Sequence, residues 1–345
     1  MNKSLCTRIL LTCLALGISV ACATTGGAKD APGWTTGDSD KYPKGKYLVG
    51  VGVGDSKAAA EDDARAQIAK IFRVQIESLT QSLSQYIGYV NSKGKESWIS
   101  GNDISTLTRS YTNEILSGVE IAERWNSPKA QVYALAVLER NSARNRLEQQ
   151  VMEMDGEIAG LMEEAAKATD KISSIKLALR ALDSKKKRSV INNQLMVVNP
   201  LGQGVDSEVN PGLLNGKLVG YLANLKLYVE VEGDGGDRIK QAVVESITRG
   251  GLQVQETDAE ADILIKGSVT GKPVNRASDT GLKFGQFEAK IEMVSAETGA
   301  TFGSINELRK EGAMDLQDAR ERCLFTLSKI IVEKFNKELY SFLTK

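Results

Sequence analysis

The amino-terminal segment, residues 1–21, constrains this chain most, because it predicts export before folding. Basic residues precede an apolar run from Ile9 to Val20, and small residues continue to Ala21, just before Cys22. This order is typical of a secretory signal peptide. The apolar run has about 12 residues, too few for a helix that crosses a bilayer core of roughly 30 Å. We therefore expect residues 1–21 to be removed and the mature chain to fold outside the cytoplasm.

The small residues before Cys22 resemble the bacterial lipobox, in which the cysteine becomes the first mature residue and carries acyl chains. A lipobox usually has leucine three positions before the cysteine, where this chain has Ser19, so cleavage after Ala21 or Ala23 without acylation is the alternative. We predict lipidation of Cys22 and attachment to a membrane through its acyl chains, because several chains anchor a protein firmly. Ala23, in place of an aspartate, resembles the sorting signal for the outer membrane. The predicted location is its periplasmic face.

The cysteines predict a fold without disulfide bonds. Cys6 and Cys13 leave with the signal peptide, and a lipidated Cys22 leaves Cys323 as the remaining thiol. An exported chain without an intramolecular disulfide must be stabilised by its hydrophobic cores. Cys323 lies on an apolar stripe of helical spacing from Leu316 to Leu339, which favours a buried core residue over a nucleophile.

Composition restricts the classes of function. The chain has 345 residues, no histidine, and 44 basic against 44 acidic residues. The commonest general base and most zinc and iron sites are therefore missing, and no field of one sign would hold nucleic acid. We predict a non-enzymatic protein with no catalytic residue, cofactor, metal site or nucleic-acid partner. The alternative is a ligand-binding protein or a carboxylate-dependent enzyme acting on cell-wall polysaccharide.

The first third of the mature chain predicts a tether and a small domain. Residues 22–46 are poor in aliphatic side chains and are interpreted as a lipid-anchored flexible tether. An amino-terminal α+β domain over residues 47–140 begins with the strand Tyr47–Gly54, in which Gly50 and Gly52 leave one face bare for close approach of a helix. The other predicted elements are a helix with an apolar stripe from Ala64 to Ile87, a second helix over Ile104–Leu116, and a hairpin of Val119–Trp125 and Val132–Leu138 joined by Asn126-Ser127-Pro128-Lys129.

A helical connector is predicted over residues 141–198. Apolar or small residues recur there at heptad spacing from Leu147 to Leu182. This spacing suits a dimeric coiled coil, and so a homo-oligomer, and also a helical hairpin turning near Thr169-Asp170, which the central alanines favour. The basic run Lys185-Lys186-Lys187-Arg188 is interpreted as a solvated helix end rather than a phosphate or lipid head-group site.

The remaining chain predicts a second domain. A linker with a short helix over residues 199–224 precedes a carboxy-terminal α+β domain over residues 225–345, and we expect the chain from about residue 216 to fold alone. A long helix from about Asp315 closes it. The other predicted elements are the strands Leu225–Val231, Leu252–Gln255, Ala261–Val269, Phe287–Ser295 and Thr301–Glu307, and a helix with Ile239, Val243 and Ile247 on one face.

Two glycine-rich motifs resemble ligand loops only weakly. The first two glycines of Gly50–Gly54 lie inside the predicted strand and Asp55-Ser56 follow the last one, so neither the dinucleotide nor the phosphate-loop spacing is present. Asp234 and Asp237 lack the spaced acids of a calcium loop and are interpreted as turn and cap residues.

Several segments in the first 140 residues carry a family resemblance. They are Pro32-Gly33-Trp34, Tyr42-Pro43, Tyr47–Gly52, the alanine-rich helix Ala58–Ala69, Gly118–Trp125 and Tyr133–Arg140. In type and order they resemble the bacterial Lpp-twenty lipoprotein family, over about residues 32–140. The resemblance implies an outer-membrane lipoprotein with a lipid-bearing cysteine, and some members of the family are associated with the flagellar basal structure. It brings no catalytic residue to this chain.

The carboxy-terminal pattern, with Ala261–Gly267, a turn at Glu297-Thr298-Gly299 and a long last helix, is similar to the domains of penicillin-binding-protein activator and curli-secretion lipoproteins. That similarity implies a protein-binding or assembly domain. The sequence thus predicts an α+β protein with two small sheet-plus-helix domains joined by a long helix or helical hairpin. It predicts a non-enzymatic outer-membrane lipoprotein that faces the periplasm, as an interaction or assembly component of the cell envelope with an envelope protein as partner.

Overall fold

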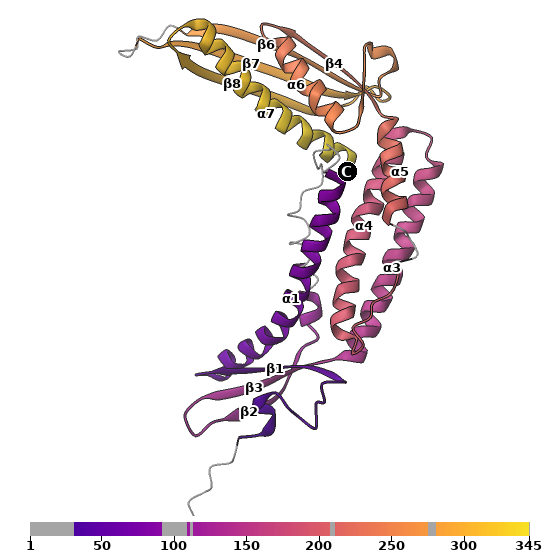
Figure 1. Cartoon of the computed structure of the whole chain (residues 1–345), viewed down its shortest axis with the longest axis vertical. Coiled ribbons are helices and arrows are strands. Elements are labelled where there is room, and N and C mark those ends of the chain that lie inside the picture. The colour runs from indigo at the N-terminus through magenta and orange to yellow at the C-terminus, as the bar shows by residue number, and fades with distance from the viewer. Residues whose placement is uncertain (1–30, 92–108, 111–112, 208–210, 275–280, 345) are drawn as a thin grey trace, which may run out of the picture.

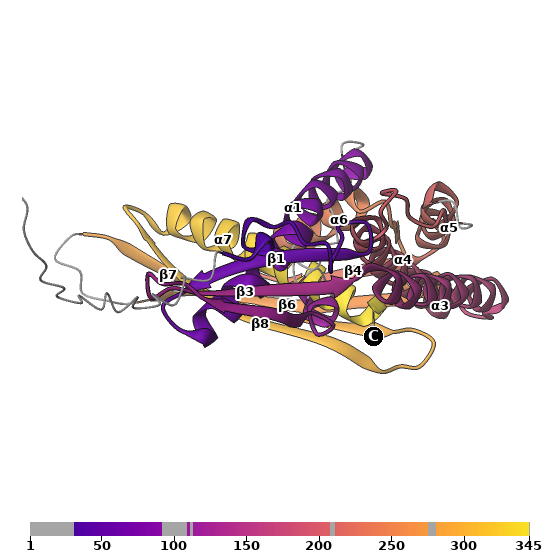
Figure 2. The same ribbon diagram turned by 90° about the horizontal axis from the view of Figure 1, so that it is seen from below.

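The computed structural model describes residues 31–91, 109–110, 113–207, 211–274 and 281–344. Two separate sheets with their helices lie at opposite ends of the molecule, and a long helical hairpin connects them (Figure 1). Seen from below, the hairpin stands to one side of both sheets (Figure 2). The predicted α+β class and the two-part architecture are confirmed.

The amino-terminal sheet has three antiparallel strands in the order β1-β3-β2. The strands are β1 (Tyr47–Gly54), β2 (Glu120–Asn126) and β3 (Val132–Glu139). The last two form the predicted hairpin, whose turn is closed by the Ser127 amide donating to the Gln131 carbonyl at 2.7 Å. Ala130 has a φ of 61°, the left-handed conformation that such a tight turn requires.

Helix α1 (Lys57–Asn91) packs on the face of β1 that its glycines leave bare. A Cβ atom added to Gly52 would lie 2.1 Å from the Ala64 amide nitrogen and 2.2 Å from the Ala60 carbonyl oxygen. Such distances are possible only for glycine, so the predicted close approach of strand and helix is confirmed. Of the helix predicted over Ile104–Leu116, the described residues 109–110 and 113–116 are helical, and the others lie outside the described residues.

Residues 32–46 differ from the flexible tether that their composition predicts. A 3-10 turn, η1 (Gly33–Thr36), packs against β1 and β3. The Tyr42 and Tyr47 rings meet edge to face with centroids 5.3 Å apart, and Arg140 donates to the Lys44 carbonyl at 2.9 Å. Aromatic rings and a long-range hydrogen bond therefore hold a segment that has too few aliphatic residues for a core of its own.

The connector is a hairpin of two antiparallel helices, α3 (Arg140–Lys167) and α4 (Lys171–Val198). The chain turns at Ala168–Asp170, where the Asp170 carboxylate accepts from the Ser173 amide at 2.7 Å and caps α4. The hairpin prediction is confirmed, and its turn lies where the sequence places it.

The carboxy-terminal sheet has five strands in the order β5-β4-β6-β7-β8. β4 is parallel to its neighbours β5 and β6, and the pairs β6-β7 and β7-β8 are antiparallel. Helices α6 and α7 pack on one face (Figure 1). The elements are α5 (Pro211–Ala223), β4 (Lys226–Gly233), α6 (Gly236–Arg249), β5 (Gln253–Gln255), η2 (Asp258–Glu260), β6 (Ile263–Val274), β7 (Lys283–Ser295), β8 (Thr301–Ala313) and α7 (Leu316–Thr344).

The hairpin contributes to two hydrophobic cores, one at each end. The end formed by the start of α3 and the end of α4 joins α1 and the amino-terminal sheet through residues such as Leu147, Val151 and Leu195. Its turn end joins the core beneath α6 and α7, through residues such as Ile158 and Ile175. The hairpin is therefore an integral part of both folds rather than a linker between them.

Candidate functional site

The predicted lipidation residue, Cys22, lies outside the described residues, so its acylation stays a prediction. Among the residues that the structure describes, no group of three His, Cys, Asp or Glu side chains could hold a metal ion. Within the same ranges, no helix is both long and apolar enough to cross a membrane.

Cys323 is fully buried in α7, as its apolar stripe predicts. Its thiol donates to the Gly285 carbonyl at 3.2 Å, and burial raises the pKa of Cys323 above its ordinary value. A thiol held in its protonated form is a poor nucleophile, so this cysteine packs as a core residue.

The glycine-rich motifs also have structural roles. The bare face of Gly50–Gly54 is filled by α1, which leaves no room for a phosphate. The Asp234 carboxylate accepts from Arg320 of α7 at 2.7 Å, and Asp237 lies in the first turn of α6. Asp234 therefore ties the turn to α7. The predicted side-chain capping is not observed, because the N-cap of α6 is Gly235 and no side chain bonds to it there.

A buried ionic cluster lies in the middle of the hairpin. Arg188 of α4 is 3% exposed, and its guanidinium donates to both carboxylate oxygens of Asp155 on α3, at 2.8 and 3.0 Å. It also donates to the carbonyls of Val205 and Asp206, at 3.0 and 2.8 Å. One side chain thus ties both helices to the chain segment that follows them.

Lys185, one turn before Arg188, belongs to the same ionic cluster. It is buried and bonded to the Ser207 hydroxyl. Burial lowers the pKa of Lys185, and the charge of Arg188 lowers it further. The interpretation of Lys185–Arg188 as a solvated helix end is therefore wrong. The helix continues to Val198, and α3 and residues 205–207 cover two of the four cations.

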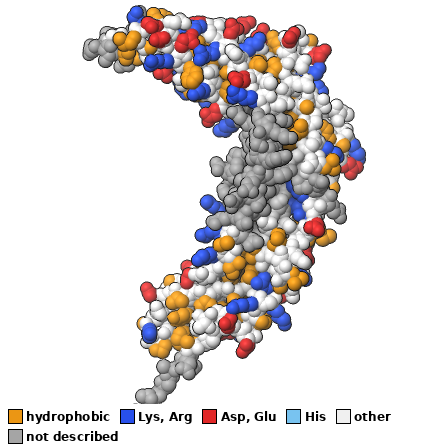
Figure 3. Space-filling view, in the orientation of Figure 1, with side chains coloured by type: hydrophobic (Ala, Val, Ile, Leu, Met, Phe, Trp, Pro, Cys, Tyr) orange, Lys and Arg blue, Asp and Glu red, His pale blue; other side chains and the backbone are white. Residues whose placement is uncertain are grey.

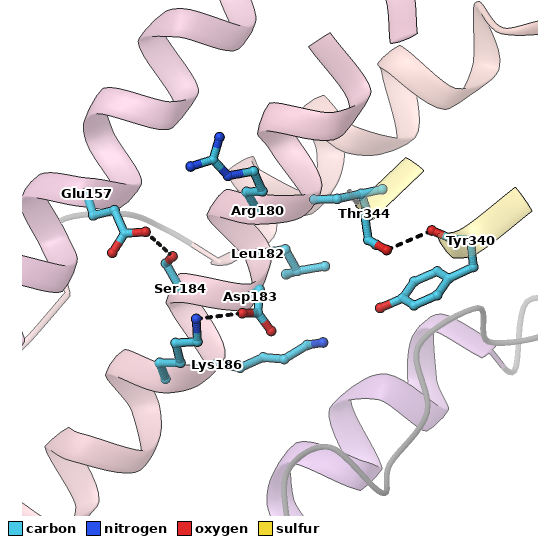
Figure 4. A pocket seen from close by; sticks show the side chains of 10 residues that line it. Glu157, Arg180, Leu182, Asp183, Ser184, Lys186, Tyr340 and Thr344 are labelled. Atoms are coloured by element: carbon cyan, nitrogen blue, oxygen red, sulfur yellow. Dashed lines mark hydrogen bonds and ion pairs between the residues drawn. The ribbon is translucent and has the colours of Figure 1, made fainter. Parts of the chain in front are cut away.

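A cavity of about 370 Å³ adjoins this cluster, between α4 and the end of α7 (Figure 4). Its two carboxylates are both engaged, since Glu157 accepts from Ser184 at 2.9 Å and Asp183 pairs with Lys187 at 3.0 Å. A glycosidase-type acid and base pair needs one carboxyl group to exchange a proton with substrate. This arrangement gives such chemistry no support. The lining residues are Glu157, Leu179, Arg180, Leu182, Asp183, Ser184, Lys186, Lys187, Tyr340 and Thr344.

Sequence reasoning singled out the basic run but missed its acidic partners. Asp155 and Glu157 lie two positions apart on α3 in an ordinary charged pattern, and only the antiparallel pairing of the hairpin brings them to Arg188 and Ser184. Gln194 of α4 was missed too. Its amide is buried and has no hydrogen-bond partner among the described residues.

Comparison with known families identifies the amino-terminal part of the molecule. Residues 32–139 match the model of the LPP20 lipoprotein family. These residues are similar to the LPP20 lipoprotein family. The predicted resemblance is confirmed, and the match begins where the structured segment before β1 begins. A lipoprotein is attached to a membrane of the cell envelope through its lipid.

Solved structures similar to this chain come from several bacteria. The secreted protein HP1454 from Helicobacter pylori is 14% identical with a TM-score of 0.41, and the match covers 83% of this chain and 96% of that one. A putative lipoprotein from Caulobacter crescentus is 13% identical with a TM-score of 0.27, covering 36% and 94%. Lipoprotein GNA1162 from Neisseria meningitidis is 11% identical with a TM-score of 0.25, covering 33% and 99%. No curated protein matches the chain.

Proposed function

We propose that this LPP20-type lipoprotein is a non-enzymatic, periplasm-facing component of the outer membrane that holds a protein-binding domain away from the bilayer. The observation that carries the proposal is the hairpin, which shares a core with each sheet. Because each helix has 28 residues, at about 1.5 Å rise per residue the hairpin spans about 40 Å. A rod built into both cores fixes the distance between the two sheets.

The anchor belongs at the amino-terminal end of this rod. Cys22 precedes the described LPP20 domain by a short stretch of chain, residues 23–30, and would carry the acyl chains. The carboxy-terminal sheet then lies at the far end, available to an envelope protein or to a machine that spans the envelope, such as the flagellar structure implied by the family resemblance. The buried ionic cluster supports this role, because Arg188 locks the hairpin to residues 205 and 206.

The test compares the wild-type chain with Cys22→Ser and, as a matched control, Cys323→Ala. We expect acyl chains on Cys22 by mass spectrometry of the mature amino-terminal peptide and sedimentation with outer membranes. Cys22→Ser should appear in the soluble fraction, whereas Cys323→Ala should remain acylated and membrane-bound. Unmodified Cys22 in the mature wild-type protein would contradict the anchor.

A photo-crosslinking amino acid tests the distal contact. It is placed at Lys266 on β6, which is exposed on the sheet face opposite α6 and α7, and, for comparison, at Lys167 near the hairpin turn. We expect a discrete crosslinked envelope protein from position 266 only. Equal products from both positions would show that the carboxy-terminal sheet is not the binding end.

A further inference from the structure

The two faces of the amino-terminal sheet are covered differently. Alternate residues of β1 face α1, so Val49, Val51 and Val53 lie on the opposite face. There η1 packs against β1 and β3, and the β3 side chains beneath, Leu135 and Val137, are buried. One half of this face is therefore closed by the segment that leads in from the amino terminus.

The other end of the same face is open in the described part of the chain. Val53 is 39% exposed, and its register partner Tyr133 and the next residue across, Trp125, are half-buried. The Trp125 and Tyr133 rings lie 5.3 Å apart. Hydrophobic side chains gather over this lower end of the molecule (Figure 3). A valine, a tyrosine and a tryptophan in one cross-strand row form what we call the aromatic row.

The short stretch of chain between Cys22 and the described structure indicates which surface the aromatic row faces. Residues 23–30 separate Cys22 from Ala31, where the described structure starts, and such a stretch spans at most about 30 Å. The chain then runs through η1, which contacts β1 and β3 on the side of the sheet away from α1 (Figure 1). An acyl chain on Cys22 therefore holds the amino-terminal domain within about 30 Å of the bilayer, and the chain enters this domain on the face that carries the aromatic row.

The chemistry of the row suits a lipid surface. Tryptophan and tyrosine concentrate at membrane interfaces, where the apolar ring is buried and the polar edge stays hydrated. Lys129, exposed in the β2-β3 turn beside the row, can reach anionic head groups. The neighbouring acid Glu123 is neutralised by Lys41 at 2.6 Å.

We propose that the aromatic row, Val53, Trp125 and Tyr133, rests on the lipid surface in which the acyl chains of Cys22 are embedded. The proposal builds on the proposed acylation of Cys22 and adds an orientation to it. The amino-terminal sheet lies against the bilayer, and the hairpin carries the carboxy-terminal sheet away from it. The competing occupants of the row are a second copy of the chain and a partner protein.

The experiment uses Trp125 as its own probe. The variant Trp34→Phe/Trp98→Phe leaves Trp125 as the one tryptophan of the full chain. The acylated protein is reconstituted into phosphatidylethanolamine and phosphatidylglycerol vesicles that contain lipids brominated on the acyl chains. Interfacial apolar side chains lie about 5–10 Å into the boundary of head groups and acyl chains, so Trp125 should lose about half of its emission. As a control, Phe325→Trp in a chain without other tryptophans should keep its emission, because residue 325 lies on α7.

Matched valine substitutions test the row itself. In the single-tryptophan chain, Val53→Asp should at least halve the quenching of Trp125. Val74→Asp, at a residue of α1 that is 61% exposed, should leave it unchanged. Circular dichroism must match the parent for both variants.

A second arm makes the result independent of natural acylation. The mature full chain without acyl chains is coupled through Cys22 to vesicles that carry maleimide lipids, in a Cys323→Ala background. If the natural protein fails to float with vesicles, the proposed acylation is wrong, and the coupled chain still tests the aromatic row. Vesicle-bound protein with unquenched Trp125 overturns the proposal. So does Trp125 emission that is already blue-shifted in lipid-free oligomers, which would assign the row to a second copy.

Discussion

The two sheets meet their helices at different distances. In the amino-terminal domain, Gly50 and Gly52 bring the backbone of β1 against the backbone of α1 at Ala60 and Ala64. In the carboxy-terminal domain, large side chains such as Phe335 of α7 fill the space over β7 and β8 and are fully buried. The stability of the first interface depends on how closely two backbones can approach. The stability of the second depends on how completely side chains fill the space between helix and sheet. Enlarging a residue should therefore damage the first, and shortening one should damage the second.

The largest expected effect is truncation in the carboxy-terminal core. Phe335→Ala should lower the free energy of unfolding by about 3–5 kcal/mol, because it leaves a cavity among packed side chains. Urea denaturation with hydrogen exchange of β7 peptides measures the loss. Phe325→Ala, at a residue of α7 that is 49% exposed, should change stability by no more than about 0.5 kcal/mol. Equal losses for the two variants would mean that α7 does not pack through Phe335.

The second largest expected effect is a larger side chain in the interface between β1 and α1. Gly52→Val should cost about 3 kcal/mol, the upper end of the usual range for overpacking, because the atoms in its way belong to the backbone of α1 and cannot rotate aside. Faster exchange in β1 and α1 peptides would report it. Gly45→Val serves as the control, since no described atom lies within 4 Å of an added Cβ there. An unchanged midpoint for Gly52→Val would show that strand and helix are further apart.

The hairpin between the two domains should be sensitive to charge. Asp155→Ala removes the carboxylate from buried Arg188 and should cost about 2 kcal/mol, typical of a lost hydrogen bond to a charged group. Glu163→Ala, which breaks an exposed pair with Lys167 on the same helix, should cost less than about 0.5 kcal/mol. Similar small effects of both variants would mean that Arg188 is satisfied by the carbonyls of Val205 and Asp206 alone.

Local patterns predicted most elements, because strand alternation, helix periodicity and turn residues act over a few positions. Tyr47–Gly54, the β2-β3 turn and the hairpin turn at Asp170 are at or near their predicted positions. Strands β6, β7 and β8 extend further than predicted toward Val274, Lys283 and Ala313. Their extensions carry polar residues on one face and little apolar alternation, and cross-strand pairing maintains them.

Features set by distant contacts could not be predicted in the same way. The burial of Arg188 depends on Asp155, which lies 33 residues earlier, and on residues 205 and 206. The predicted boundary at about residue 216 falls inside α5, and the core of the carboxy-terminal domain includes hairpin residues such as Ile158. Composition alone assigns the hairpin and the carboxy-terminal sheet to separate parts of the chain, whereas their side chains pack into one core.

The smallest expected effect concerns a glycine outside any interface. Glycine is required at position 52, where a strand and a helix are in backbone contact, but on an exposed helix it lowers stability. Gly156 is an exposed residue of α3, and no described atom lies within 4 Å of a Cβ added there. Gly156→Ala should therefore stabilise the chain by about 0.5–1 kcal/mol, through better helix propensity and a less flexible unfolded state. A rise in the urea midpoint measures it. A fall would show that this face of α3 is in close contact with another surface in solution, because only such a contact makes glycine better than alanine on an exposed helix.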